Sequence, residues 1–564
     1  DPHRPYDPPP PFERSYAGEV SYVDSLLQRL LSFLDEAGLA PSTVLVVTAD
    51  HGESLGEHGE DTHGFFLYQS TLHVPLLMRA PAIPAGERSK ALIRTIDVAP
   101  TLLEILDLEA PSSFEGVSFV SAKGESRWPV VEAISETFVP RLHYGWSELR
   151  SLRRNNWKLV EAPRSELYDL DADPREERNR IADEDTVARG LRARLDELPR
   201  PESIRPESLD PGTLASLRAL GYLGGSSEAP APEQSFADLP DPKDRLEVYR
   251  VLNELTAVST PTEADVERLA RVLEREPRSA KAMSMYGNFL LDLRRSREAR
   301  ESFERLLEID PDSFDGLYGL GRALANLGKA EAALETLEKA LTLDPRSVGI
   351  YSRLAEIETT RGNLESAERW LTTGIERAPS GLLYRELADL LLASGRGAEI
   401  SKIADGWKGP GADAARSYAR AALLDSQGNT EGALAELARA LALAPHDDNL
   451  EQAFANGLSR AGRFEEAMAH YQAILARTPC YLGALTNLGA AHERRGNVEE
   501  GIRAYERAIQ CDSTYVNAYR NLGAALARKG DLGRALEALR KARTLAPGDA
   551  ELDAAIAELE RLTR

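Results

Sequence analysis

The feature that most constrains the fold of this 564-residue chain is a 34-residue period in its second half. Eight residues mark this period: Pro277, Pro311, Pro345, Pro379, Pro445, Pro479, Ser513 and Pro547. Six of the seven intervals between them are 34 residues, and the remaining interval of 66 is two residues short of two periods. Twenty-four residues before most marks stands a small residue: Gly287, Gly321, Ala355, Ala421, Ala455, Gly489 and Gly523. Small residues let antiparallel helices approach closely, and proline can start a helix without losing a hydrogen bond. The period therefore predicts stacked helical hairpins.

This pattern resembles the tetratricopeptide repeat (TPR), which has the same period and small-residue positions. We count eight units over 278–547, preceded by a helical lead-in over 244–277 and followed by a capping helix over 548–564. The unit around 380–411 departs from the pattern, because Ile400 and Trp407 replace small residues. The resemblance implies an all-α solenoid whose groove binds a protein or peptide partner; a scaffold without a fixed ligand is the alternative.

Charge and hydropathy exclude two classes of partner. The 68 Lys and Arg against 91 Asp and Glu leave a net charge of −23, which opposes binding to nucleic acid phosphates. No run of 18 apolar residues is present, so we expect no membrane span in this chain. The chain begins Asp-Pro-His without an initiator Met, and a periplasmic or membrane-anchored protein is expected only if a targeting segment precedes residue 1.

The first 200 residues have the pattern of an α/β domain. A Pro/Gly/Ser-rich linker over 201–243, interrupted by a short helix at Thr213–Leu220, separates them from the helical half. Within residues 1–200 we expect a helix around Val20–Leu34, a buried strand at Thr43–Val47, a strand at Val74–Met78, a helix at Pro100–Leu106, and strands near 149–153 and 157–161.

Histidines and acidic residues concentrate directly after the strand at Thr43–Val47. Four of the nine histidines lie within residues 51–73, and Asp50 and His51 stand side by side at the end of the strand. Ligands of open α/β sheets bind beyond the carboxyl ends of the strands, so both side chains can reach one cation there. Ca²⁺ or Mg²⁺ would prefer the carboxylate as a ligand, and Zn²⁺ would bind both side chains. The alternative interpretation is that this segment is a solvated loop that binds no metal.

The order of motifs resembles the sulfatase family of the alkaline-phosphatase superfamily over residues 1–185. The matching segments are Asp1–Tyr6, Asp50–Glu53, Glu57–Gly59, Val74–Leu76, Asp97–Leu102, and Glu166–Leu170 followed by Asp173, Pro174 and Asn179. The resemblance implies a mixed α/β sheet with a small C-terminal sheet. It also implies hydrolysis of a sulfate or phosphate ester with a divalent cation, Ca²⁺ or Mg²⁺ before Zn²⁺ or Mn²⁺.

Family roles transfer to four residues. Asp50 and His51 match the late pair of metal ligands, and His3 matches the histidine that contacts the sulfate or the leaving-group oxygen. His63 falls where many sulfatases have an active-site lysine; its charge depends on pH, which leaves the preference for sulfate or phosphate open. We do not expect Glu53 and His58 to be metal ligands, and we expect a structural role for His73. We assign no residue to a cofactor other than the metal ion.

In the sulfatase family the nucleophile lies in a Cys/Ser-x-Pro-x-Arg segment, and residues 1–200 contain no segment of this pattern. We therefore expect the N-terminal half of the sulfatase-like domain, with nucleophile and two early Asp ligands, to precede residue 1, and this chain to be inactive alone. Without the strands of that missing half, we expect the sheet around Thr43–Val47 to expose an open apolar face. The alternatives are a phosphodiesterase, a phospho-headgroup transferase, or a non-catalytic TPR scaffold carrying a degenerate hydrolase domain.

Both cysteines of the chain lie in the repeats. Cys480 begins the first helix of one unit and Cys511 ends its second helix, so the antiparallel pairing makes them neighbours. Cysteine is often simply a small buried residue, and two neighbouring thiols without a bond are the simpler expectation.

Overall fold

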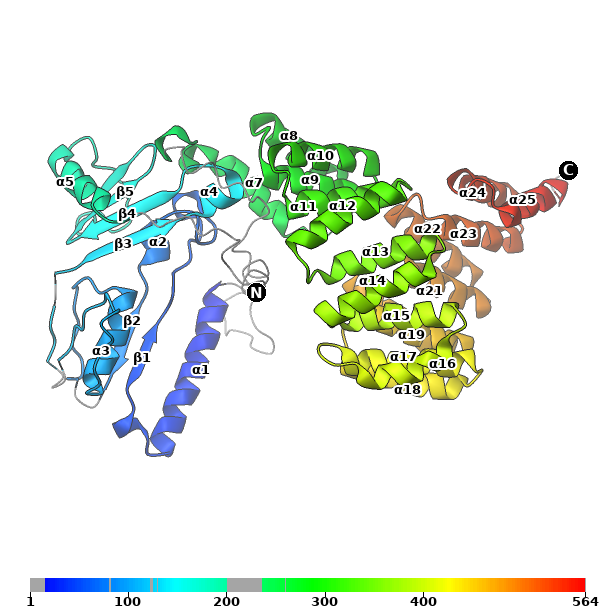
Figure 1. Ribbon diagram of the computed structural model, residues 1–564, viewed down its shortest axis with the longest axis horizontal. Helices are drawn as coiled ribbons and strands as arrows, with labels where there is room; N and C mark the ends of the chain where they lie inside the picture. The colour runs from blue at the N-terminus through cyan, green and yellow to red at the C-terminus, as the bar shows by residue number, and fades with distance from the viewer. Residues whose placement is uncertain are drawn as a thin grey trace. The chain divides into compact units, whose positions relative to one another are not determined.

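A computed structural model describes residues 16–80, 83–121, 125–128, 130–199, 236–258 and 260–562 (Figure 1). The chain divides into two compact units. Unit 1 runs to Val258 and includes Arg271–Ala282, whereas unit 2 contains Ser259–Ala270 and Met283–Arg564. None of the described helices is long and apolar enough to cross a membrane.

Unit 1 contains two antiparallel sheets. Strand β1 (Leu45–Thr48) pairs with β2 (Leu76–Arg79), so that Leu45 lies opposite Arg79. The second sheet has the order β3-β4-β5-β6. Its strands are β3 (Glu132–Thr137), β4 (Leu149–Arg154), β5 (Trp157–Glu161) and β6 (Glu166–Asp169). Leucines of β4, β5 and β6 pack against α5 (Asp185–Asp196) and form the core of this sheet.

Helices and 3-10 turns complete unit 1, and the longest of them is α1 with 21 residues. They are α1 (Tyr16–Glu36), η1 (Ala40–Ser42), η2 (Glu57–Gly59), α2 (Gln69–Leu72), η3 (Thr95–Asp97), α3 (Val98–Ile105), α4 (Val139–Tyr144), η5 (Phe236–Asp238), η6 (Pro242–Arg245) and α7 (Leu246–Thr256). The predicted helix at Pro100–Leu106 and the predicted strands near 74–78, 149–153 and 157–161 are confirmed with small shifts of their ends. The predicted short helix at Thr213–Leu220 lies outside the described residues.

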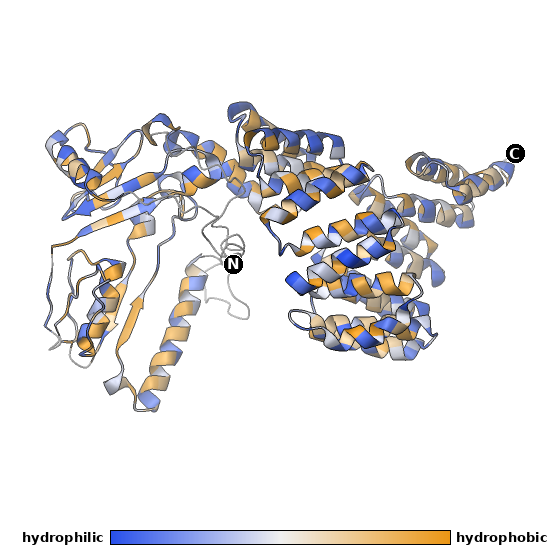
Figure 2. Ribbon diagram, in the orientation of Figure 1, coloured by the Kyte–Doolittle hydropathy of each residue, from blue (hydrophilic) through white to orange (hydrophobic). Residues whose placement is uncertain are grey.

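The expectation that Thr43–Val47 is a buried strand is wrong in one respect. A strand forms at Leu45–Thr48, but it pairs with β2 in a sheet of two strands and remains partly exposed. The open apolar face expected there is confirmed, since Leu77 of β2 is 61% exposed. Helix α1 exposes a further apolar stripe with spacings of three and four residues, visible as hydrophobic colour in Figure 2, formed by Tyr16, Val20, Val23, Leu26, Leu30 and Phe33.

Unit 2 is an all-helical array in which consecutive helices pack in antiparallel pairs. In the described residues, the helices from α9 to α24 form eight pairs, of which only Ala280–Ala282 at the start of α9 belong to unit 1. They are α9 (Ala280–Asp292) and α10 (Ser296–Ile309), α11 (Phe314–Asn326) and α12 (Ala330–Leu343), α13 (Val348–Thr360) and α14 (Leu364–Arg377), α15 (Gly381–Ala393) and α16 (Gly397–Ile403), α17 (Ala412–Ser426) and α18 (Thr430–Leu443), α19 (Asp448–Arg460) and α20 (Phe464–Arg477), α21 (Leu482–Arg494) and α22 (Val498–Cys511), and α23 (Val516–Lys529) and α24 (Leu532–Leu545). Helix α8 (Glu263–Arg275) precedes them and α25 (Ala550–Leu562) follows.

Close packing explains the small residues of the period. A Cβ atom added at Gly321 would lie 2.6 Å from the Leu337 side chain, well inside van der Waals contact. The unit over 380–411 solves the same problem differently: α16 has only 7 residues, and the buried Trp407 stacks on Tyr384 with ring centroids 4.6 Å apart. The Tyr384 hydroxyl donates to the Lys408 carbonyl at 2.8 Å, which fixes the segment that replaces the missing half-helix.

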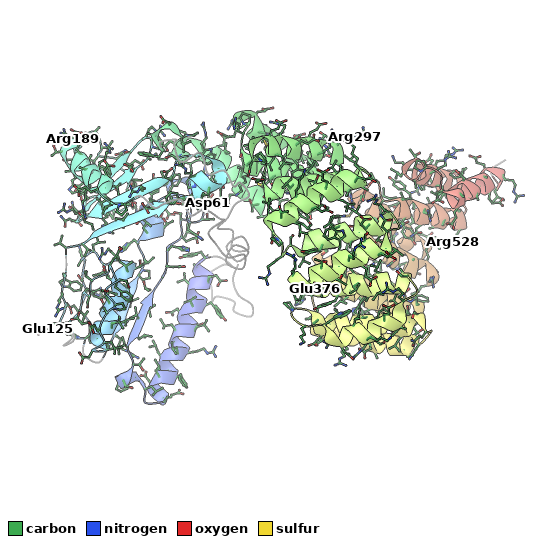
Figure 3. The ribbon with its side chains drawn as sticks, viewed as in Figure 1. Asp61, Glu125, Arg189, Arg297, Glu376 and Arg528 are labelled. Atoms are coloured by element: carbon green, nitrogen blue, oxygen red, sulfur yellow. A yellow bond between two sulfur atoms is a disulfide. The ribbon has the colours of Figure 1, made fainter. Side chains whose placement is uncertain are left out.

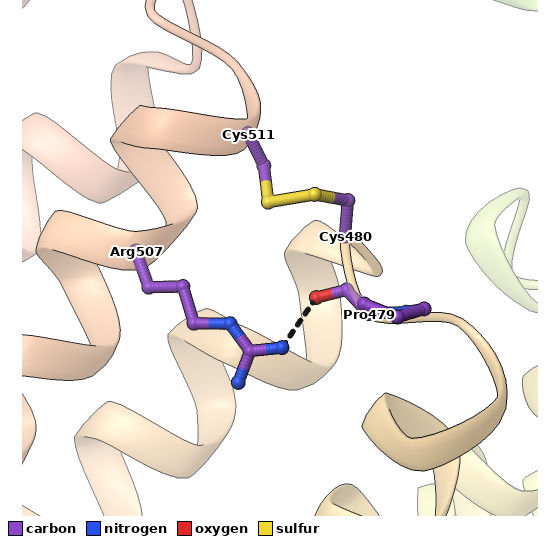
Figure 4. Close-up of a disulfide and its surroundings, with 4 residues drawn as sticks. All are labelled: Pro479, Cys480, Arg507 and Cys511. Atoms are coloured by element: carbon purple, nitrogen blue, oxygen red, sulfur yellow. Dashed lines mark hydrogen bonds between the residues drawn. A yellow bond between two sulfur atoms is a disulfide. The ribbon is translucent and has the colours of Figure 1, made fainter. Parts of the chain in front are cut away.

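Cys480 and Cys511 form a disulfide with Cα atoms 5.5 Å apart (Figure 4). The prediction that they are neighbours is confirmed, whereas the expectation of two thiols without a bond is wrong. Antiparallel packing brings the turn before α21, which carries Cys480, beside the end of α22, within the distance that a disulfide spans. Arg507 holds the same junction, because its guanidinium donates to the Pro479 carbonyl at 2.9 Å (Figure 4).

We predict that replacing both cysteines with serine lowers the free energy of unfolding of the array by about 3 to 4 kcal/mol, because the bond closes a loop of 31 residues in the unfolded chain. Urea unfolding followed by circular dichroism measures the loss. Reductant should destabilise the native chain by a similar amount and leave the double serine variant unchanged. An unchanged urea midpoint in the variant would contradict the prediction.

Candidate functional site

The candidate site lies in the loop between β1 and α2, residues 49–68, which we call the site loop. Gly52 anchors its start: its N–H donates to the Thr71 carbonyl at 2.7 Å, and a Cβ atom there would lie 2.3 Å from the Ser70 carbonyl oxygen. Only glycine fits so close to this backbone. The turn that carries Asp50 and His51 is therefore fixed against α2.

Asp50 and His51 converge at the carboxyl end of β1. Asp50 Oδ2 lies 3.7 Å from His51 Nε2, and both side chains are accessible, at 87% and 43% exposure. The His51 backbone N–H donates to Asp50 Oδ1 at 2.9 Å, which holds the pKa of this carboxyl below its ordinary value. His51 Nδ1 donates to the Gly52 carbonyl at 2.9 Å, because a carbonyl can only accept, so a neutral ring keeps its lone pair on Nε2.

This arrangement fits two ligands of a divalent cation. With Asp50 Oδ2 and His51 Nε2 3.7 Å apart, both atoms could bind one divalent cation, and the carboxylate and the imidazole would be its ligands. A histidine ligand usually donates its other ring nitrogen to a carbonyl or carboxylate, as His51 does. No group of three or more His, Cys, Asp or Glu side chains that could hold a metal ion is found among the described residues.

The other histidines differ in their surroundings. The rings of His63 and His51 lie side by side with centroids 4.0 Å apart and planes tilted by 31°, and His63 Nδ1 lies 3.0 Å from Glu53 Oε2. His58 stacks on Tyr68 at 3.6 Å and its Nε2 donates to the Arg175 carbonyl at 3.0 Å, so it ties the site loop to the segment after β6. His73 is exposed at the end of α2, and His3 lies outside the described residues.

Two buried carboxyl groups that the sequence motifs did not single out hold the loop in place. Glu60 is fully buried and accepts from the backbone N–H of Phe65 at 2.7 Å. Glu176 is 2% exposed; one of its oxygens accepts from Lys158 Nζ at 2.7 Å and the other from the Gln69 N–H at 2.6 Å. Glu176 thereby links β5 to the start of α2.

Helix α7 packs on the site loop within unit 1. The Tyr249 ring stacks on Phe65 with centroids 4.1 Å apart, and its hydroxyl lies 3.0 Å from Thr62 Oγ1. Arg250 donates to the Gly59 carbonyl at 3.2 Å. The first helix of the lead-in segment is thus a direct support of the loop that carries His58 and His63.

Comparison with known families fits both halves of the chain. Residues 8–108 match the model of the sulfatase family. Models of tetratricopeptide repeats match residues 266–314, 287–348, 324–388, 494–530 and 516–549. The chain joins a sulfatase-family segment to a TPR array. The predicted fold class, an α/β sulfatase-like region followed by an all-α TPR solenoid, is confirmed.

Known sulfatases are similar to part of this chain over part of their own length. The N-acetylglucosamine-6-O-sulfatase of Bacteroides thetaiotaomicron is 34% identical over 184 residues, which are 30% of this chain and 32% of the relative. Human arylsulfatase K is 28% identical over 177 residues, 28% of this chain and 32% of that enzyme. The chain therefore spans about a third of the length of these sulfatases.

One solved structure similar to the chain is entitled "Crystal structure of APC/C hetero-tetramer Cut9-Hcn1". It covers 63% of this chain and 65% of its own at 15% identity. Its TM-score of 0.35 is too low to support a comparison of the two folds in detail.

We predict that the stability of the site loop in the sulfatase-family segment falls as the pH rises. Burial raises the pKa of Glu60 from 4.5 to about 7. The unfolded chain loses this proton near pH 4.5 and the folded chain near pH 7, so the free energy of opening falls by about 3 kcal/mol between these values and stays constant above.

Hydrogen exchange of the Phe65 and Phe66 amides, corrected for the intrinsic effect of pH, measures this dependence. Glu60→Gln should remove it, because the amide oxygen still accepts from Phe65 but does not ionise. Glu109→Gln, at an exposed glutamate, is the matched control and should keep the native dependence. Equal slopes for all three proteins would show that Glu60 does not titrate in this range.

Proposed function

We propose that the sulfatase-family segment belongs to a metal-dependent hydrolase of sulfate or phosphate esters, and that Asp50 and His51 supply two ligands to its divalent cation. The observation that carries the proposal is the approach of Asp50 Oδ2 and His51 Nε2 to 3.7 Å, with the lone pair of the ring left on Nε2. The names of the sulfatase relatives support the ester class. Oxygen ligands favour Ca²⁺ or Mg²⁺, and the imidazole also suits Zn²⁺ or Mn²⁺.

The residues have separate tasks in this proposal. A bound cation would stabilise the charge that develops on the ester oxygens. Asp50 and His51 hold the cation, and His63 beside them faces the anionic group of the substrate through its free ring nitrogen. His3 is proposed to contact the same group or the leaving oxygen. A protonated His63 would donate to an ester oxygen, and a neutral one would not.

The experiment uses the polypeptide that carries this sequence, purified at its natural length. We expect hydrolysis of para-nitrophenyl sulfate or para-nitrophenyl phosphate that EDTA abolishes and Ca²⁺ or Mg²⁺ restores. Asp50→Ala and His51→Ala should each lower kcat/KM by about 100-fold or more, because each removes a ligand. His73→Ala, an exposed histidine of the same region, is the control and should keep full activity.

Hydrolysis that persists in EDTA or in both variants would contradict the proposal. A phosphate diester is included as a third substrate. Faster hydrolysis of the sulfate ester would indicate a sulfatase, and faster hydrolysis of the diester would indicate a phosphodiesterase. We further propose that the 564-residue chain alone hydrolyses none of these esters, since residues 1–200 contain no Cys/Ser-x-Pro-x-Arg segment. Turnover by the chain alone would overturn that part.

We also propose that the TPR array binds a protein or peptide along the first helices of its units. Polar side chains on these helices meet in a row from α9 to α17: Arg322 with Asn288 at 3.0 Å, Ser352 with Glu386 at 2.6 Å, and Tyr418 with Asp389 at 2.9 Å. A photo-crosslinking residue at Tyr318, on α11, should capture a purified partner. The same residue at the exposed Leu443, on α18, should not, and equal capture at both would contradict this surface.

A further inference from the structure

The contact between Glu53 and His63 has a defined chemistry. His63 Nδ1 lies 3.0 Å from Glu53 Oε2 and 3.3 Å from Oε1. A carboxylate has no proton to donate, so Nδ1 is the donor in this contact and carries the ring proton. In a neutral ring, the lone pair is then confined to Nε2.

The backbone holds both partners of this contact. Glu53 lies between Gly52 and Ser54, whose N–H groups donate to the carbonyls of Thr71 at 2.7 Å and Thr62 at 2.9 Å. The second of these bonds joins the residue after Glu53 directly to the residue before His63. The buried Ser54 also meets Ser70 through the two hydroxyls at 2.7 Å. The carboxylate and the imidazole therefore face each other before any ligand binds.

We propose that Glu53 is the positioning residue of this site: it fixes His63 against His51 with the proton on Nδ1, so that Nε2 is the ring nitrogen left to face the ligand. His51 has the same arrangement with a backbone carbonyl in place of the carboxylate. Two adjacent rings, with centroids 4.0 Å apart, thus both keep Nδ1 for the protein and Nε2 for the ligand. The identity of that ligand rests on the proposed function; the tautomer does not.

The test reads the tautomer directly in the full chain without cation or ester. In protein labelled with ¹⁵N-histidine, long-range ¹H–¹⁵N spectra distinguish protonated from unprotonated ring nitrogens, and a His63→Gln spectrum assigns the signals. Native His63 should carry its proton on Nδ1. Glu53→Ala should move the proton to Nε2, which a free neutral imidazole prefers, whereas Glu53→Gln should retain it on Nδ1, because the amide oxygen still accepts.

Asp61→Ala is the matched control, because Asp61 is an exposed carboxylate two residues before His63 (Figure 3). It should leave the His63 signals unchanged. The His51 signals report whether the loop stays folded in each variant. Native His63 with its proton on Nε2, or an Nδ1 proton retained in a folded Glu53→Ala variant, would overturn the proposal. Neither result changes the metal dependence of ester hydrolysis, so the two proposals fail separately.

At natural length, Glu53→Ala should lower kcat/KM for the ester by about 10- to 100-fold, the usual cost of removing a partner that orients an active-site ligand. Glu53→Gln should recover most of this loss. A purely structural role would instead make both variants equally poor and equally unstable.

Discussion

Replacing Tyr249 with alanine is expected to destabilise the site loop by about 3 to 5 kcal/mol, the usual cost of removing a buried aromatic side chain. Tyr249 is 4% exposed and stacks on Phe65, which is fully buried. Phe65 in turn contacts Trp146 edge to face at 5.9 Å. The alanine would open a cavity between α7 and the loop that carries His63.

Hydrogen exchange over residues 59–68 measures this effect. Tyr249→Phe is the matched control: it keeps the ring stack and removes only the contact with the Thr62 hydroxyl, at a cost of about 1 kcal/mol. Protection of residues 59–68 that is equal in the alanine variant and the native chain would show that α7 does not support the loop.

Replacing Lys158 with methionine is expected to cost about 3 to 5 kcal/mol, because it leaves the charge of Glu176 buried without its partner. The two side chains are each 1% exposed, and their charged atoms lie 2.7 Å apart. Burial lowers the pKa of Lys158, so the pair depends on close geometry. Loss of the pair would also weaken the hold of Glu176 on the Gln69 N–H.

The double variant Lys158→Met and Glu176→Gln separates charge from packing. It removes both charges and keeps an acceptor for the Gln69 N–H, so it should recover a large part of the stability. Thermal unfolding of the chain with each variant measures the difference. A single Lys158→Met variant as stable as the native chain would show that the pair contributes nothing net.

The array was predictable from sequence because its packing repeats. Each unit needs small residues where two helices approach, as at Gly321 beside Leu337, and the same demand recurs every 34 residues. The sequence showed that the unit containing Trp407 departs from the repeat pattern. It did not show how that unit packs, because the stack of Trp407 on Tyr384 and the short α16 depend on tertiary contacts. For the two cysteines, the sequence predicted that they lie close together but not that they form a disulfide.

The candidate site was predictable where its residues are adjacent in sequence, as Asp50 and His51 are. The supports were not, because they come from distant segments: Glu176 reaches Gln69 across 107 positions, and Tyr249 reaches Thr62 across 187. An amphipathic helix pattern such as that of α7 shows that one face is buried but not against which partner. The partial exposure of β1 was missed for the same reason, since a run of β-branched residues does not show how many strands will pack beside it.

The central claim, a cation held by Asp50 and His51, is tested most directly by X-ray diffraction from crystals of the natural-length protein grown with Mn²⁺. We expect an anomalous peak in contact with Asp50 Oδ2 and His51 Nε2, about 2.0–2.3 Å from each. The peak should vanish in Asp50→Ala crystals. A Mn²⁺ ion bound elsewhere in the sulfatase-family segment, with both side chains free of it, would contradict the account.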